Sequence, residues 1–169
     1  MNLDKIKKQF LSDEDYEDAQ EAFIKIESSE VDDFIINLLD SEKPYIRSRS
    51  SWVIKEKKLQ KAVPHLFRNI LKKENFKSNG SMVYALTELD CSEHFKDLFQ
   101  IYILGNYEPK THANTIINEQ ELKFTKKELE EVEELWESCK KNPTLCPCFE
   151  DAKEVIQNNI NYYKEKLKS

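Results

Sequence analysis

The sequence predicts an all-α protein built from antiparallel helical hairpins that stack on one another. Its 169 residues include only 2 glycines, and 34% of them are charged. This composition suits amphipathic helices joined by short polar loops better than β-hairpins. Apolar residues also recur at helical spacing in segments about 32 residues apart. Such a repeat is typical of helix pairs that bury their apolar faces against their neighbours.

Three hairpins are predicted, over residues 31–57, 62–89 and 94–120. The apolar positions of their first helices coincide after a shift of 32 residues: Val31, Ile35, Leu38 and Leu39, then Val63, Phe67, Ile70 and Leu71, then Phe95, Phe99, Tyr102 and Ile103. The second helices are expected at 44–57, where Pro44 suits the first turn, and at 76–89. The second helix of the third hairpin fits two registers. Two steps of 32 residues match Val53 and Ile54 to Ile117 and Asn118, whereas a last step of 31 residues matches them to Ile116 and Ile117.

End-capping helices are predicted on both sides of the hairpins, over 3–27 and 125–168. The first includes a helix from 13 to 26 with Ser12 as its N-cap. In the second, Thr125 followed by Glu128 has the spacing of a capping box. Since no linker or low-complexity tract interrupts the pattern, residues 1–169 are predicted to form one domain.

The segment DSEKPYIRSRSSWVI, residues 40–54, resembles the turn and second helix of a HEAT repeat. The resemblance extends over about Val31 to Gln120 and is strongest in the first hairpin. It implies a right-handed superhelical stack, an α-solenoid, whose second helices line a concave groove that binds a partner. The residues that match the family pattern are the turn aspartate Asp40, the Ile46-Arg47 pair, the small pair Ser50-Ser51 and the Val53-Ile54 pair.

Columns of outward side chains on the second helices give the candidate partner-binding residues. With the 32-residue step, one column contains Trp52, Tyr84 and Ile116, and exposed aromatic residues are common anchors in protein interfaces. Packing of Trp52 and Tyr84 between adjacent helices remains the alternative. The neighbouring columns and the basic stretch around Trp52 add Ser48, Arg49, Glu56, Glu88, His112 and Gln120.

Charge favours a basic protein as the partner. The chain has 26 Lys and Arg against 32 Asp and Glu, a net charge of -6. Nucleic-acid binders draw most of their affinity from basic residues, so this balance argues against a nucleic-acid partner. No apolar run is long enough to span a bilayer, and the lysine-rich stretch 1–10 lacks the apolar region of a signal peptide. A cytoplasmic location is therefore expected, with no membrane partner; the pattern sets no oligomeric state.

No catalytic site, cofactor or metal centre is predicted. The sequence lacks a glycine-rich phosphate loop, and its three histidines lie in different hairpins. Cys139, Cys146 and Cys148 are the candidate metal ligands, because three thiols fall within ten residues. Their C-x-C spacing differs from the C-x2-C and C-x4-C pairs common in zinc sites, so reduced structural thiols are expected.

The sequence is compatible with three functions. The first is a non-catalytic protein-binding module, such as an immunity protein that neutralises a basic toxin. The second is a nucleic-acid enzyme, because the basic stretch Arg47–Lys61 around Trp52 resembles the helical-repeat alkylpurine DNA glycosylases. The chain is shorter than that family, and no match to the context of its catalytic aspartate is found. The third is a structural or assembly scaffold.

Overall fold

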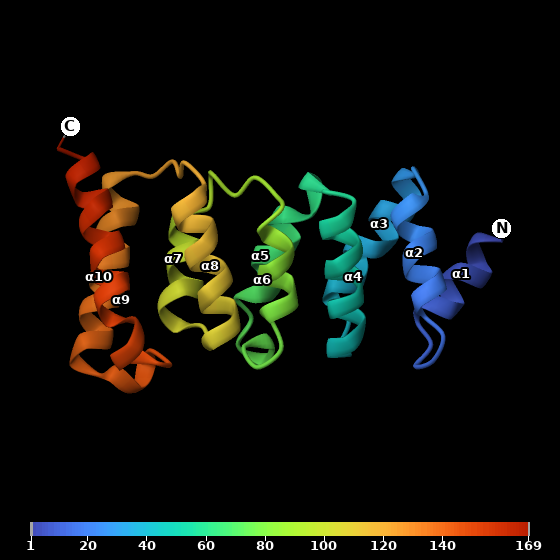
Figure 1. Ribbon diagram of the computed structural model, residues 1–169, viewed down its shortest axis with the longest axis horizontal. Coiled ribbons are helices and arrows are strands. Elements are labelled where there is room, and N and C mark those ends of the chain that lie inside the picture. Colours follow the sequence, from blue (N-terminus) through green and yellow to red (C-terminus); the bar gives the residue numbers. More distant parts are fainter. Residues whose placement is uncertain (1, 169) are drawn as a thin grey trace.

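The chain is all-helical in a computed structural model, which describes residues 2–168 (Figure 1). These residues form ten α-helices and four short 3-10 helices, with no strand among them. The all-α prediction is therefore confirmed. The helix pairs follow one another along the long axis of the molecule in chain order, and the two ends of the chain lie at opposite ends of the molecule. Within residues 2–168, no helix has both the length and the apolar character that a membrane crossing requires.

The N-terminal pair consists of α1 (Leu3–Phe10) and α2 (Glu17–Lys25). The buried rings of Phe10 and Phe23 meet edge to face, with centroids 5.2 Å apart. The prediction that Ser12 caps a helix starting at residue 13 is wrong, because α2 begins four residues later. The Ser12 hydroxyl donates instead to the carbonyl oxygens of Gln9 and Glu14, which stabilises a turn.

The next pair consists of α3 (Ser29–Asn37), continued by the 3-10 helix η1 (Leu38–Asp40), and α4 (Pro44–Glu56). Pro44 occupies the first turn of α4, where its missing N–H costs no hydrogen bond. Ser50 and Ser51 are completely buried, and such small side chains allow neighbouring helices to approach closely. The Ser51 hydroxyl donates to the carbonyl of Arg47 at 2.7 Å, one turn back in the same helix.

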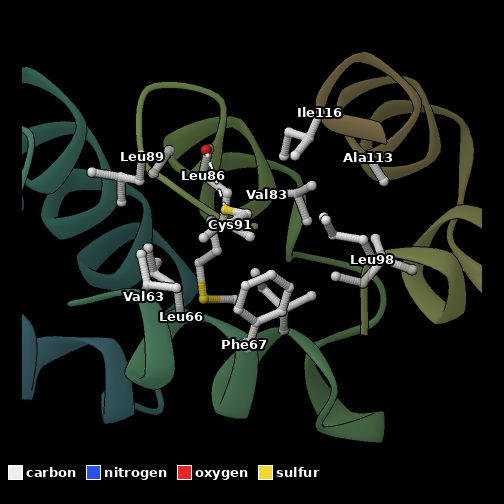
Figure 2. Close-up of a cluster of buried hydrophobic side chains, with 14 of the residues drawn as sticks. Val63, Leu66, Phe67, Val83, Leu86, Leu89, Cys91, Leu98, Ala113 and Ile116 are labelled. Atoms are coloured by element: carbon white, nitrogen blue, oxygen red, sulfur yellow. Dashed lines mark hydrogen bonds between the residues drawn. The ribbon is translucent and has the colours of Figure 1, made fainter. Parts of the chain in front are cut away.

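The third pair follows the short η2 (Gln60–Ala62) and consists of α5 (Val63–Ile70) and α6 (Gly80–Leu86), with η3 (Lys73–Asn75) between them. A helix was expected to begin at residue 76, but α6 starts at Gly80. The buried Asn79 side chain donates to the carbonyl of Ile70 at 3.1 Å, which holds residues 76–79 in a turn. Figure 2 shows the core at this pair, where side chains of α5 and α6 meet Leu98, Ala113 and Ile116.

The C-terminal half consists of α7 (Phe95–Leu104), α8 (Tyr107–Glu119), α9 (Lys126–Lys141), η4 (Pro143–Leu145) and α10 (Phe149–Lys166). The predicted capping box is confirmed, because Thr125 accepts from the Glu128 N–H at 3.2 Å and the Glu128 carboxylate accepts from the Thr125 N–H at 2.8 Å. The Phe95 ring joins these helices, with its centroid 4.8, 4.9 and 4.9 Å from those of Phe99, Phe124 and Tyr163.

The second helices of successive pairs lie side by side, because α2 packs against α4, α4 against α6, and α6 against α8. The burial pattern resolves the ambiguous register. Ile116 and Ile117 are both buried, whereas Asn118 is exposed, so the 31-residue step describes the third copy. A shift of one residue turns a side chain by about 100° around a helix, which decides which residues of α8 face the surface.

Candidate functional site

Two large aromatic side chains are exposed on adjacent second helices. Trp52 on α4 is 43% exposed and Tyr84 on α6 is 36% exposed. Each lies between buried neighbours: Ser51 and Val53 flank Trp52, and α6 buries Val83 and Ala85 on either side of Tyr84. Because the flanking side chains fill the core, the helical period turns both rings outward. The structure therefore places Trp52 and Tyr84 on one surface rather than in the interior.

The ammonium group of Lys55 lies between these two rings. Its Nζ is 5.4 Å from the ring centroid of Trp52 and 4.9 Å from that of Tyr84, both within the range of a cation–π interaction. It also pairs with the Glu56 carboxylate at 3.2 Å. Partial desolvation acts to lower the pKa of Lys55, but the hydrogen bond to Glu56, together with the charges of Glu56, Tyr84 and Glu88, raises it above its ordinary value.

The surface continues onto α8 through the ring of His112. The His112 and Tyr84 ring centroids are 4.9 Å apart and tilted by 41°. On the other side, the Glu88 carboxylate pairs with Lys58 at 3.5 Å, and both side chains are well exposed. We call this surface the Trp52–Tyr84 face; it consists of Trp52, Lys55, Glu56, Tyr84, Glu88 and His112. Ser48 is exposed one turn before Trp52 and borders it.

All three predicted binding residues at α8 were placed with the 32-residue step, and of these only His112 lies beside Tyr84. Ile116 is 1% exposed and belongs to the core, so its expected place beside Tyr84 is wrong. With the 31-residue step, Thr115 takes that place, and the exposed Glu119 replaces Gln120 in the column of Glu56 and Glu88. Glu119 was missed, although the alternative step in the sequence could have identified it. It borders a hollow of about 560 Å³ between α8 and α10, which is lined by Asn118, Asn159 and Tyr162 among others.

Gln120 has a structural role instead. Its side-chain amide donates to the Leu89 carbonyl at 2.8 Å and its carbonyl accepts from the Cys91 N–H at 2.8 Å. Gln60 braces the same loop from the preceding pair, because it bonds both the N–H and the carbonyl of Asp90, at 2.9 and 2.7 Å. These two glutamines therefore stabilise residues 89–91, the connection between α6 and α7.

Arg49 is also structural, and its predicted role in partner binding is not supported by its position. Its side chain is buried, and its Nη1 donates to the carbonyls of Phe10 at 3.0 Å and Ser12 at 2.6 Å. The guanidinium carbon lies 3.4 Å from the ring centroid of Tyr16 and 4.7 Å from that of Tyr45. Arg49 thus connects α4 to the turn between α1 and α2.

The basic stretch around Trp52 is largely occupied by interactions within the chain. Arg47 donates to the Ser41 carbonyl at 2.8 Å and to the Ser78 hydroxyl at 2.7 Å. Lys57 pairs with Asp32 at 2.9 Å and donates to the Phe23 carbonyl at 3.3 Å. Lys61 pairs with Asp33 at 2.9 Å. Because these cations already have internal partners, the stretch does not form an open basic track for a phosphate backbone.

The candidate metal ligands lie around a buried lysine, Lys110, which no pattern in the sequence indicates. Cys139 and Cys146 are buried and Cys148 is exposed. Lys110 donates to the carbonyls of Tyr102 at 2.6 Å and Ile103 at 2.9 Å, and its Nζ is 3.6 Å from the Cys146 sulfur. Burial lowers the pKa of Lys110, although the neighbouring thiols oppose this shift. The lysine satisfies carbonyl groups at the end of α7, and no metal-binding group of three or more His, Cys, Asp or Glu side chains is found in residues 2–168.

Comparison with known proteins gives no further guide to the site: the chain matches no family model, no curated protein and no solved structure.

Proposed function

We propose that this chain is a non-catalytic protein-binding module, a HEAT-like superhelical stack whose second helices present the Trp52–Tyr84 face to a basic protein partner. One observation carries the proposal: two exposed aromatic rings lie on adjacent helices, with the carboxylates of Glu56 and Glu88 beside them. Trp and Tyr are enriched among the residues that carry most of the binding energy in protein interfaces, and such anchors lie inside a polar rim.

The exposed area of Trp52 is enough to make this side chain an anchor of an interface. An aromatic side chain buries roughly 150–250 Å² when fully covered. With 43% of its surface exposed, Trp52 has on the order of 100 Å² left to bury. At about 25 cal/mol per Å², covering it contributes about 2–3 kcal/mol. Truncation of Trp52 to alanine should therefore weaken binding by about 30-fold or more.

Charge supplies the second argument. The chain carries a net charge of -6, and the carboxylates of Glu56 and Glu88, each paired with a lysine, lie next to the exposed rings. Such a charge distribution steers a basic partner to the surface and raises the association rate at low ionic strength. Neutralisation of a basic toxin, the role of an immunity protein, is one function that this chemistry fits. A nucleic-acid enzyme fits less well, because the basic stretch around Trp52 is occupied internally.

A capture experiment with matched variants tests the proposal. The wild-type chain, Trp52→Ala, Tyr84→Ala and the control Tyr107→Ala are immobilised and exposed to extract from the source cells. Tyr107 is 75% exposed and lies outside the Trp52–Tyr84 face, so its loss should change nothing. We expect a basic protein that binds wild type and Tyr107→Ala, is lost with the other two variants, and binds more slowly as salt increases. Equal capture by all four proteins, or no salt-sensitive capture, would overturn the proposal.

Duplex DNA provides the counter-test. We expect no binding at physiological ionic strength, because the basic stretch around Trp52 is largely occupied by interactions within the chain. Binding of DNA that weakens steeply with salt and is lost in Trp52→Ala would favour the nucleic-acid function instead.

A further inference from the structure

The position of Lys55 indicates which side chain of a partner the Trp52–Tyr84 face is built to accept. The Lys55 ammonium lies between the rings of Trp52 and Tyr84, which belong to different helices, and pairs with Glu56. The Lys55 side chain is only 13% exposed, whereas those of Glu56 and Glu88 are 37% and 43% exposed. The chain's own cation is therefore covered, while the groups that hold it remain open to a partner.

The Lys58–Glu88 ion pair is weak and can be exchanged. Lys58 pairs with Glu88 at 3.5 Å with its side chain 70% exposed, and exposed ion pairs of this kind contribute little to stability. The Lys55 stem is long and flexible, so its ammonium can move into solvent without any change in the backbone. An incoming cation therefore competes with two lysines for a site that already has two aromatic rings and two carboxylates.

A guanidinium group suits this site better than an ammonium group. It is planar and weakly hydrated, so it stacks on aromatic rings more readily. It also donates two parallel hydrogen bonds to a carboxylate, which an ammonium cannot do with the same geometry. Arg49 shows such an arrangement elsewhere in the chain: its guanidinium lies over the rings of Tyr16 and Tyr45.

We propose that the Trp52–Tyr84 face is a receptor for an arginine side chain of the partner, which enters between the two rings, binds Glu56 or Glu88, and displaces Lys55. This inference rests on the proposed function, since it names the chemistry of the partner at the same surface. It also assigns Lys55 a role as an internal competitor, which weakens the binding of any incoming cation.

The test uses short peptides rather than the unidentified partner. The probe is acetyl-Gly-Arg-Gly-Arg-Gly-amide, and the same peptide with citrulline is the control, because citrulline keeps the shape of arginine but has no charge. Binding is followed by NMR through the indole N–H signal of Trp52. The chain has 2 tryptophans, so Trp52→Phe assigns the two indole signals, and the signal of the buried Trp136 reports whether each variant is folded.

We expect the arginine peptide to shift the Trp52 signal and the citrulline peptide to leave it unchanged. Lys55→Met removes the competing cation, so it should tighten arginine binding about tenfold. Glu56→Gln and Glu88→Gln should each weaken it about threefold. Lys43→Met is the matched control, because Lys43 lies over the ring of Tyr45 at 5.5 Å, outside the Trp52–Tyr84 face, and its loss should have no effect.

Equal shifts by the two peptides would overturn the inference. It would also be overturned if Lys55→Met keeps the wild-type Trp136 signal but binds the arginine peptide no more tightly, because Lys55 would then only join α4 to α6. The proposed function fails separately. If the capture experiment finds a Trp52-dependent partner while the arginine peptide shifts nothing, protein binding stands and the arginine receptor fails. If the arginine peptide binds as expected and no partner is captured, the arginine site stands and the proposal of protein binding fails.

Discussion

Replacement of Arg49 by methionine should detach the N-terminal helices at a lower denaturant concentration. The substitution removes two hydrogen bonds from a charged donor to the carbonyls of Phe10 and Ser12. Each such bond is worth about 1.5–3 kcal/mol, and the stacking of the guanidinium on Tyr16 adds about 1–2 kcal/mol. Methionine recovers part of the apolar contact and avoids burying a charge, so the net loss should be about 3 kcal/mol.

Urea unfolding followed by circular dichroism at 222 nm measures this loss. With a denaturant dependence of about 2 kcal/mol per molar urea, a loss of about 3 kcal/mol lowers the midpoint by about 1.5 M. Hydrogen exchange should accelerate first in α1 and α2, because Arg49 is the residue of α4 that bonds the turn between them. The exchange pattern thus separates local opening of this end from a loss spread over the whole chain.

Arg68→Met is the matched control for Arg49→Met. Arg68 pairs with Asp40 at 2.6 Å, but its side chain is 53% exposed, so its loss should cost about 1 kcal/mol or less. The reasoning is refuted if Arg49→Met is as stable as Arg68→Met. If partner capture were lost in that case, Arg49 would be a contact residue, as the sequence alone suggested.

Three further substitutions test other parts of the structure by urea unfolding. Burial lowers the pKa of Lys110 in the folded chain, so the unfolded chain binds more protons as the pH rises toward 10.5. The free energy of unfolding of wild type should therefore rise relative to that of Lys110→Met over this range. A difference in free energy that stays constant with pH would contradict this. Burial raises the pKa of Cys91 to about 12 from 9.0, so the folded chain binds more protons than the unfolded chain above pH 9. The free energy of unfolding of wild type should therefore fall by about 1 kcal/mol by pH 10, and that of Cys91→Ala should not. Parallel pH profiles of stability in the two proteins would disprove the assignment. Gln120→Ala leaves the Leu89 carbonyl and the Cys91 N–H without their partner and should cost about 1–3 kcal/mol, whereas Glu119→Ala, at an exposed site, should cost almost nothing; similar losses in both variants would argue against the backbone role of Gln120.

The helices were predictable from the sequence because their determinants are local. The spacing of Val31, Ile35 and Leu39 sets the buried side of α3 and η1, and the Thr125–Glu128 capping box sets the start of α9. The start of α6 was not predictable in this way. It depends on the bond from Asn79 to the Ile70 carbonyl, which joins residues of different elements.

The candidate site was predictable only in part. Trp52 and Tyr84 were found because they lie in two hairpins that keep the same 32-residue step. Ile116 was misplaced because the third hairpin is one residue shorter, and one residue changes the direction of a side chain by about 100°. Arg49 looked like a surface cation, since no local pattern reveals a hydrogen bond to a carbonyl 39 residues away.

The order of the helices along the molecule has a consequence for how the chain folds. Because successive pairs pack on their neighbours in the sequence, most native contacts close short loops, and the entropy lost in closing each of them is small. Proteins rich in such local contacts fold faster than proteins that depend on pairing of distant segments. Folding can begin at any pair with a sufficient core, such as the cluster around Phe67 and Leu86, and then spread toward both termini.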